Sequence, residues 1–143
     1  NDVVLGGTLR YLDTDMRLVG QFKPGTADRP IEEYHSDDRL LELADQALND
    51  LNIHHIVGII ATGNYFVDDP QKVEQVIRET GADAVEMEGA AVAHVAARND
   101  VPALVIRALS DNADTGYEDF KTFDISEYAD TAAKLTVNIA KRM

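Results

Sequence analysis

The sequence contains no cysteine and no tryptophan, and its 13 basic residues are outnumbered by 26 acidic ones. Without cysteine there is no disulfide, no thiolate metal site and no cysteine nucleophile. The formal net charge of −13 argues against nucleic acid and anionic membrane surfaces as partners, because both are polyanions. No apolar run approaches the ~18 residues of a membrane span. We therefore expect a cytoplasmic protein that binds neither nucleic acid nor membrane.

The composition is that of a folded protein. The 143 residues are 45% hydrophobic and 27% charged, which provides enough apolar side chains for an ordinary core. The sequence shows no internal repeat, no low-complexity tract and no stretch with the composition of a linker. We therefore predict one domain over residues 1–143.

Hydrophobic patterns predict strands and helices that alternate along the chain. Short runs rich in β-branched residues indicate strands, and apolar stripes at helical spacing indicate helices. Such alternation predicts an α/β fold of three layers, with helices flanking a mainly parallel mixed sheet. Residues 21–35 are predicted to form a long loop. The predicted strands span residues 3–5, 56–61, 84–85 and 103–109, and the predicted helices begin at or just after Ser36, Asp69, Gly89 and Asp124.

Helix boundaries follow from capping residues. Ser36 is a good N-cap for the first helix. Asp69 precedes a proline at the first helical position of the second helix, and Gly81 is placed to end that helix. Asp124 and Glu127 have the spacing of a capping box at the start of the last helix.

Polar or unusual residues follow three of the predicted strands. They are T-G-N-Y-F-V-D-D after residue 61, E-M-E-G after Val85, and R-A-L-S-D-N-A-D at the end of the 103–109 strand. Ligands of open α/β sheets bind beyond the carboxyl ends of the strands, and these ends share one edge in a parallel sheet. The pattern therefore predicts that Phe66, Met87, Glu88 and Asp111 converge.

Each of these residues also has a purely structural interpretation. Glu88 could stabilise the dipole at a helix N-terminus. Glu86 could pair with Arg107 on a neighbouring strand. Residues 110–114 could serve as capping and turn residues, and Phe66 could belong to the core. The residue pattern by itself leaves both kinds of interpretation open.

Metal and phosphate sites are not indicated. The glycines at 6, 7 and 63 are too sparse for a phosphate-binding loop. The acidic segment at 111–119 lacks the alternating carboxylates and closing glutamate of a calcium loop. We expect no metal and no cofactor. The four histidines, at positions 35, 54, 55 and 94, lack metal-ligand spacing and are expected to be solvated or core residues.

Two long segments carry a family resemblance. A-V-E-M-E-G-A-A-V-A-H-V-A, followed by V-P-A-L-V-I-R-A-L-S-D-N-A-D, resembles the nucleoside phosphorylase/nucleosidase superfamily. Within it, the sequence is most similar to the nucleosidases of 5′-methylthioadenosine and S-adenosylhomocysteine. L-R-Y-L-D-T-D and I-I-A-T-G-N-Y-F-V occur upstream in the expected order. The resemblance runs over essentially the whole chain and implies a nucleoside phosphorylase-like fold.

The resemblance implies roles for the residues around the sugar. Glu88 would accept hydrogen bonds from the 2′- and 3′-hydroxyls of the ribose, and Met87 would line the sugar. Arg107 would help to hold the water that attacks the anomeric carbon. Glu86 would then organise Arg107.

The resemblance also implies roles around the base. Asp111 would hydrogen-bond the purine and deliver a proton to its N7 atom. Phe66 would stack on the adenine, the main chain of Val67 would recognise its edge, and Ser110 would support the loop of Asp111. Protonation makes adenine a neutral leaving group, and general acid catalysis of this kind contributes about 10²–10⁴-fold.

The sequence departs from the family at several places. Family members begin well upstream, with strands that supply a water-activating glutamate and a glycine-rich loop. We therefore expect residues 1–143 to be the C-terminal part of an incomplete domain that lacks these strands. Residues 19–30 match the family poorly, and Leu12 stands where the family commonly has histidine. The expected partners are a nucleoside substrate, a second copy in a homodimer and the N-terminal segment.

The resemblance favours hydrolysis of 5′-methylthioadenosine and S-adenosylhomocysteine with release of adenine. A related futalosine hydrolase or purine nucleoside phosphorylase is the alternative enzyme. Phosphorylases need a cationic phosphate site, and Arg107 is the one cation of the predicted pocket in this chain, which favours water as the acceptor. A non-catalytic nucleoside-binding fragment is a further alternative, although a binder needs no proton donor at position 111.

Overall fold

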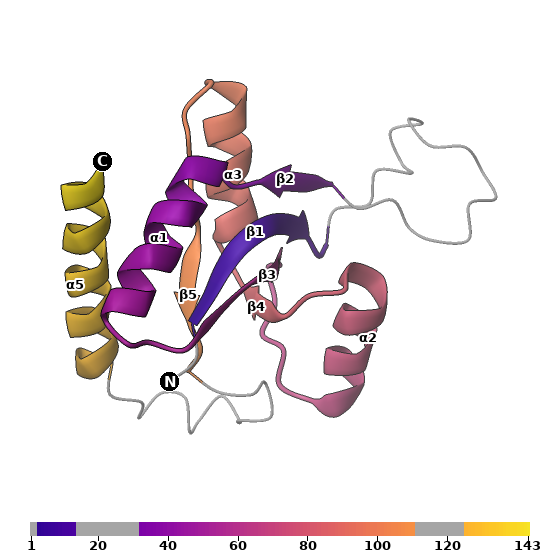
Figure 1. Ribbon diagram of the computed structural model, residues 1–143. Coiled ribbons are helices and arrows are strands. Elements are labelled where there is room, and N and C mark those ends of the chain that lie inside the picture. Colours follow the sequence, from indigo (N-terminus) through magenta and orange to yellow (C-terminus); the bar gives the residue numbers. More distant parts are fainter. Residues whose placement is uncertain (1–2, 14–31, 111–124) are drawn as a thin grey trace.

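The computed structural model describes residues 3–13, 32–110 and 125–143 (Figure 1). Within this part of the chain, no helix has the length and apolarity that crossing a bilayer requires. The elements are β1 (Val3–Tyr11), β2 (Glu33–His35), α1 (Asp38–Asp50), β3 (His55–Thr62), α2 (Pro70–Thr80), β4 (Ala84–Glu86), α3 (Gly89–Arg98), β5 (Ile106–Ala108) and α5 (Ser126–Arg142).

The strands form one mixed sheet. Its order is β2-β1-β3-β4, and β5 also pairs with β1. Strands β1, β3 and β4 are parallel to one another, whereas β2 and β5 run antiparallel to β1. The predicted mainly parallel α/β sheet is confirmed. Two details of the prediction are wrong, because β5 is antiparallel and residues 33–35 of the predicted loop form β2.

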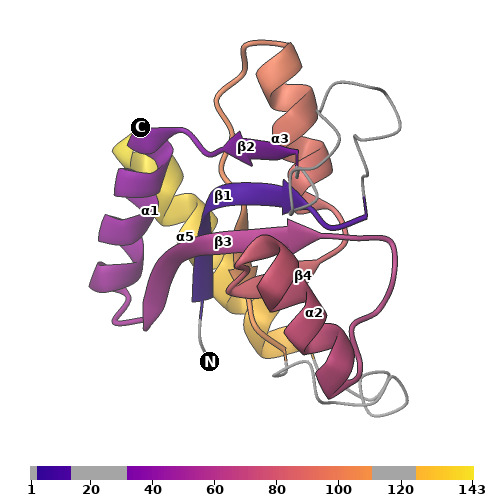
Figure 2. The ribbon, with the colours of Figure 1, turned by 90° about the vertical axis from the view of Figure 1, so that its right-hand side faces the viewer.

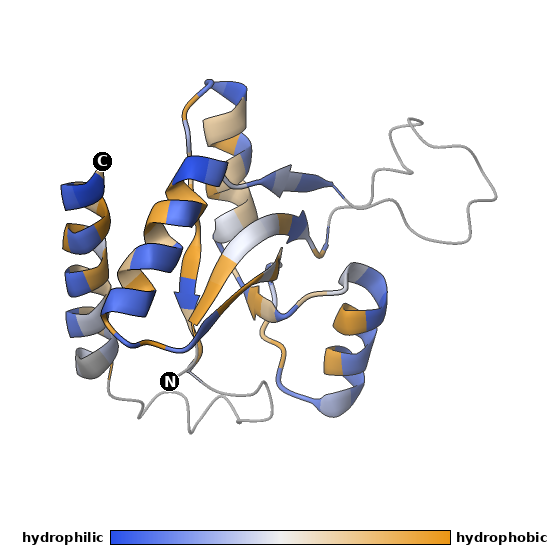
Figure 3. Cartoon of the chain, in the orientation of Figure 1, coloured by the Kyte–Doolittle hydropathy of each residue, from blue (hydrophilic) through white to orange (hydrophobic). Residues whose placement is uncertain are grey.

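Helices cover both faces of the sheet (Figures 1 and 2). Val4 and Ile60 pack against α3 through its buried alanines, Ala90 and Ala93. On the other face, the core side chains of β1 pack against α1 and α5, and Ala61 packs against α2. The mixture of hydrophobic and hydrophilic residues on α1 and α2 in Figure 3 fits helices with one buried side. The arrangement confirms the predicted three layers.

A bulge in β1 keeps its hydrophobic residues on the correct faces. The register against β3 shifts between Gly6 and Thr8, so that one extra residue lies in β1. Since strand side chains alternate between faces, one inserted residue reverses the alternation. Val4 and Leu9 therefore both belong to the cluster beneath α3, although they are five positions apart and same-face residues of a regular strand are an even number of positions apart. A Cβ atom on Gly6 would lie 2.9 Å from the Ile60 side chain and 3.2 Å from the Val105 carbonyl oxygen, so a side chain at this position would crowd both neighbours.

The caps of the helices were only partly predicted. Asp69 caps α2 by accepting a hydrogen bond from the Lys72 amide at 2.9 Å, and Gly81 ends this helix with a φ of 66°, as predicted. The prediction for α1 is wrong by one residue: Asp37, not Ser36, is the N-cap. The buried Ser36 hydroxyl instead donates to the Gly6 carbonyl at 2.6 Å. Asp124 of the predicted capping box lies outside the described residues.

His55 ties the start of β3 to α1 and gives the fold a pH-dependent contact. Its Nδ1 and Nε2 atoms each lie 2.9 Å from an acceptor, the Ile53 carbonyl and an Asp45 carboxylate oxygen. Only an imidazolium can donate to both. Burial by itself lowers the pKa of His55, but these bonds outweigh burial, and the pKa lies above its usual value of 6.5.

This contact predicts a loss of stability on raising the pH. Since the folded-state pKa of His55 is raised, its contribution is complete below pH ~6.5 and disappears as the pH rises through the folded-state pKa. Between pH 6 and 8, the wild type should therefore lose more unfolding free energy than His55→Gln, as measured by urea denaturation. The neighbouring His54→Gln variant should still show the wild-type loss. Equal pH slopes for the wild type and His55→Gln would contradict the assignment.

Candidate functional site

Strands β3 and β4 end side by side and place two polar side chains together. Their register pairs Thr62 with Glu86 at the last residue of each strand. Both residues are two positions from a partner in the α3-facing cluster, Ile60 and Ala84, so both lie on the α3 side of the sheet. Because ligands of open α/β sheets bind beyond such carboxyl ends, this position is the candidate site.

Glu86 is the most highly connected side chain at this edge. Its carboxylate accepts hydrogen bonds from the Thr62 hydroxyl and from Arg107, whose Nε lies 2.9 Å from Oε2. It also accepts from the backbone amides of Glu88 at 3.1 Å and Gly89 at 2.7 Å. A Cβ atom at residue 89 would lie 3.1 Å from both carboxylate oxygens, so a glycine allows this close approach.

These contacts keep Glu86 ionised although its side chain is only 10% exposed. Burial by itself raises the pKa of Glu86, but the hydrogen bonds from Thr62 and Arg107 and the positive charge of Arg107 outweigh it. The pKa of Glu86 therefore lies below its usual value. The carboxylate is a fixed negative charge at neutral pH and is not suited to donate a proton.

Glu88 has a different environment two residues later. It occupies the N-cap position of α3, yet its side chain makes no capping hydrogen bond. Glu86 accepts the amide hydrogen bonds at this helix start instead. Glu88 therefore lies at the helix N-terminus, as its interpretation as a dipole-stabilising carboxylate requires, but its side chain is not a hydrogen-bonded cap. The Glu88 side chain is 67% exposed, and an oxygen of it lies 3.0 Å from Arg107. A carboxylate that is exposed and oriented in this way can accept hydrogen bonds from a ligand.

Arg107 joins the two glutamates. It lies on β5 and reaches Glu86 through Nε and Nη2, while Nη2 also contacts Glu88. The predicted pairing of Glu86 with Arg107 is present, but not between neighbouring strands, because β3 and β1 lie between β4 and β5 in the sheet order. The Arg107 side chain is 35% exposed. The long Arg107 side chain therefore joins two strands that are not hydrogen-bonded to each other.

The other predicted residues belong to three segments of the sequence: beside the glutamates, after β3 and after β5. Met87 lies between the two glutamates in the sequence and is 47% exposed. Phe66 and Val67 lie in the segment between β3 and α2, and the Val67 side chain is buried in the cluster beneath α2. Ser110 follows β5 and is exposed. Asp111, the predicted proton donor, lies outside the described residues.

Sequence reasoning missed Thr62 as a site residue. Its side chain is 4% exposed, and its hydroxyl donates to Glu86 and accepts from the Ala90 amide at 2.8 Å. In the sequence it is one more β-branched residue at the end of an apolar strand. The available signal was its position, since it is the first residue of T-G-N-Y-F-V-D-D, the polar segment that follows the predicted strand over residues 56–61.

A second polar contact fixes the turn after β3. Both the backbone amide and the side-chain amide of Asn64 donate to one Asp13 oxygen, at 2.9 and 2.8 Å. Leu12, where the family commonly has histidine, is buried with Val67 in the α2 cluster. The ends of β1 and β3 are thus held together beside the site.

The histidines do not form a metal site within the described part of the chain. His94 on α3 instead stacks on Tyr34, with ring centroids 4.6 Å apart, and its Nδ1 lies 3.2 Å from the Tyr11 hydroxyl. Burial, together with a hydrogen bond to Glu32, raises the pKa of Tyr34 to about 12. This cluster packs β1 and β2 against α3.

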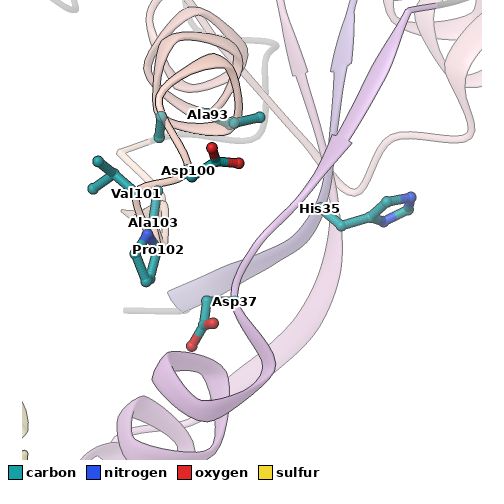
Figure 4. A pocket seen from close by; sticks show the side chains of 9 residues that line it. His35, Asp37, Ala93, Asp100, Val101, Pro102 and Ala103 are labelled. Carbon is teal, nitrogen blue, oxygen red and sulfur yellow. The ribbon is translucent and has the colours of Figure 1, made fainter.

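A shallow hollow of 340 Å³ lies at the other end of α3, away from the glutamates. It is lined mainly by small residues of α3 and the following turn, together with three polar side chains. Figure 4 shows that the His35 ring points away from both Asp37 and Asp100, so these polar groups do not converge on a common point. Asp37 is in addition engaged as the N-cap of α1. We therefore place the candidate site at the glutamates and not in this hollow.

Comparison with known proteins identifies the family. A model of the phosphorylase superfamily matches residues 1–143. The chain belongs to the phosphorylase superfamily. This membership confirms the resemblance carried by the E-M-E-G and R-A-L-S-D segments.

Individual relatives narrow the comparison within the phosphorylase superfamily. A 5′-methylthioadenosine/S-adenosylhomocysteine nucleosidase of Tolumonas auensis is 39% identical over 136 residues, which are 93% of this chain and 56% of that protein. An aminodeoxyfutalosine nucleosidase of Campylobacter jejuni is 39% identical over 146 residues, 99% of this chain and 60% of the relative. The chain thus spans less than two thirds of the length of these superfamily members.

Solved structures of the superfamily share the fold. The Helicobacter pylori 5′-methylthioadenosine/S-adenosylhomocysteine nucleosidase, solved with butyl-thio-DADMe-Immucillin-A, superposes with a TM-score of 0.83 at 31% identity. The alignment covers 99% of this chain and 61% of the other. The predicted nucleoside phosphorylase-like fold is therefore confirmed.

Proposed function

We propose that the protein hydrolyses the N-glycosidic bond of purine nucleosides of the 5′-methylthioadenosine and S-adenosylhomocysteine class and releases adenine. One observation carries this proposal: the exposed Glu88 carboxylate is oriented by Arg107 at the carboxyl edge of the sheet. The relatives named as nucleosidases of these compounds support the same substrate class.

Cleavage of the N-glycosidic bond requires different protein groups beside the sugar and beside the base. Cleavage develops positive charge on the sugar and negative charge on the base. Glu88 is proposed to accept hydrogen bonds from the ribose diol, beside Met87, and its negative charge favours the cationic sugar of the transition state. Arg107, held by Glu86, is proposed to position the attacking water.

The base side of the proposal depends on residues around the turn after β5. Asp111 is proposed to protonate the purine at N7 as a general acid, supported by Ser110. Phe66 and the main chain of Val67 are proposed to hold the adenine from the segment after β3. The proton donor and the diol acceptor then act on the two halves of one nucleoside.

The charge balance of the described site favours water over phosphate as the acceptor. Arg107 contacts two carboxylates, Glu86 and Glu88, so its positive charge is already neutralised. A phosphate anion placed there would meet net negative charge.

A second candidate substrate class is aminodeoxyfutalosine, because a relative named as an aminodeoxyfutalosine nucleosidase matches this chain with 39% identity. The homodimer and the cytoplasmic location remain predictions.

An assay of products tests the proposal. The protein should be incubated with 5′-methylthioadenosine, with and without phosphate, both as the 143-residue chain and joined to the N-terminal segment expected from the family. Adenine and the free sugar should appear at the same rate in both buffers. A sugar 1-phosphate formed only with phosphate would contradict hydrolysis. No adenine from either form would overturn the enzymatic function, and faster cleavage of aminodeoxyfutalosine would assign the second substrate class.

A further inference from the structure

At the start of α3, the residue in the N-cap position is not the residue that accepts the capping hydrogen bonds. In most helices the N-cap side chain itself accepts the amide hydrogen bonds of the first turn. Here the N-cap residue, Glu88, makes no such bond. Glu86 accepts from the Glu88 and Gly89 amides, and Thr62 accepts from the Ala90 amide at 2.8 Å. The backbone amides of residues 88–90 thus donate to side chains at the ends of β3 and β4. The Glu88 carboxylate is not needed as a cap and can contact a ligand.

Thr62 connects the two parts of this substitute cap. Its hydroxyl accepts one hydrogen bond from the Ala90 amide of α3 and donates one to Oε1 of Glu86. A hydroxyl has one proton to donate, the Ala90 amide can only donate to the hydroxyl oxygen, and the ionised carboxylate can only accept, so the direction of both bonds is defined. With Oε1 occupied in this way, Oε2 of Glu86 faces Arg107, whose Nε lies 2.9 Å away.

The chain of contacts continues to the proposed ligand. Arg107 extends from Glu86 to Glu88 at 3.0 Å. A rotation of the Glu86 carboxylate would therefore move the guanidinium and remove the neighbour that orients Glu88. Supporting hydrogen bonds of this kind hold the side chains that touch a ligand in the positions and orientations that binding requires.

We propose that Thr62 is a positioning residue of this site: its hydroxyl fixes the Glu86 carboxylate, and Glu86 in turn holds Arg107 and leaves Glu88 for the ligand. The inference rests on the proposed function only for the identity of that ligand. It concerns a residue that touches neither the sugar nor the base in the proposed arrangement.

Three variants test the role of the hydroxyl. Thr62→Val keeps the shape and removes the hydroxyl, and Thr62→Ser keeps the hydroxyl. Thr80→Val is the matched control, because Thr80 is also buried and its hydroxyl also donates to a carbonyl, that of Val76, and accepts from an amide, that of Ala82. Thr80 lies in α2 and belongs to no part of the site.

Binding of 5′-methylthioadenosine, measured by calorimetry, is the first readout. Thr62→Val should weaken binding about tenfold, while Thr62→Ser and Thr80→Val should stay within about twofold of the wild type. The two valine variants should be compared after urea denaturation has established their stabilities. Equal binding by Thr62→Val and the wild type, equal loss in Thr80→Val, or no recovery in Thr62→Ser would each overturn the proposal.

The pKa of the Glu86 carboxyl, followed by NMR, is the second readout and needs no substrate. Loss of the Thr62 hydrogen bond should raise this pKa in Thr62→Val and leave it unchanged in Thr62→Ser and Thr80→Val. If the wild type binds no nucleoside, the proposed function fails, and this measurement alone decides the positioning role. An unchanged pKa in Thr62→Val would then overturn it.

Discussion

Replacing Asp111 by asparagine is expected to slow adenine release by about 10²–10⁴-fold, the range that general acid catalysis contributes. An amide at position 111 can still hydrogen-bond the purine but has no acidic proton to give to N7. Binding of 5′-methylthioadenosine should therefore stay within a few-fold of the wild type. Single-turnover rates and calorimetric binding measure the two quantities separately.

The control for this experiment is a carboxylate of similar chemistry outside the site. Asp130 lies on the surface of α5 and pairs with Lys134 at 2.6 Å. Asp130→Asn should leave both the rate and the binding unchanged. If Asp111→Asn loses nucleoside binding but cleaves bound nucleoside at the wild-type rate, Asp111 is a binding residue and another group protonates the base.

The helices could be predicted from the sequence because their boundaries depend on local chemistry. Pro70 and Gly81 mark the ends of α2 through fixed backbone preferences, and both predictions are confirmed. The predicted N-cap of α1 is wrong by one residue because two adjacent residues, Ser36 and Asp37, have suitable side chains. A tertiary contact decided between them, since the Ser36 hydroxyl donates to the Gly6 carbonyl of the neighbouring strand β1.

The direction of β5 could not be predicted from its residues. A run of β-branched side chains indicates a strand, but it does not specify whether the strand is parallel or antiparallel to its neighbour. In the structure the preceding segment is held by two backbone bonds, from the Gly6 amide to Val105 and from the Asp37 amide to Ala103. These contacts fix the path into β5 and are long-range, so no local pattern reveals them.

The site was predictable where residue types are unusual and not where they are ordinary. Two glutamates between a strand and a small-residue helix drew attention, because charged groups at such positions need partners. Thr62 opens the polar segment after the predicted strand, but a threonine suits any strand end and so does not by itself indicate a role in the site. The family resemblance implies different roles for the two glutamates, Glu88 on the ribose and Glu86 on Arg107, but the residue types alone do not show which carboxylate is buried. The fold separates them: Glu86 is 10% exposed and Glu88 is 67% exposed.

The separation of the two glutamates leads to the second large effect, which is on stability. Replacing Glu86 by alanine should lower the free energy of unfolding by about 3 kcal/mol, because the buried partners of its carboxylate lose their acceptor and Arg107 loses its main counter-charge. Glu86→Gln keeps an acceptor oxygen and should lose less, about 1–2 kcal/mol. Urea denaturation at pH 7 measures both changes.

A surface ion pair provides the matched control. Glu33 pairs with Arg10 at 2.9 Å, but its side chain is 39% exposed. Exposed pairs contribute at most about 1 kcal/mol, so Glu33→Ala should have a small effect. If Glu86→Ala is no less stable than Glu33→Ala, the carboxylate of Glu86 does not organise the site in the way its contacts indicate.

The same carboxylate should give the protein a specific sensitivity to acid. Because the folded-state pKa of Glu86 is lowered, its contribution to stability is complete above the ordinary glutamate pKa of 4.5 and is lost as the pH falls through the lower folded-state value. The wild type should therefore lose more unfolding free energy than Glu86→Gln between pH 5 and pH 3. Glutamine cannot be protonated in this range, so the difference between the two curves isolates one group. Parallel curves would show that the Glu86 carboxylate is no better stabilised in the folded protein than in the unfolded chain.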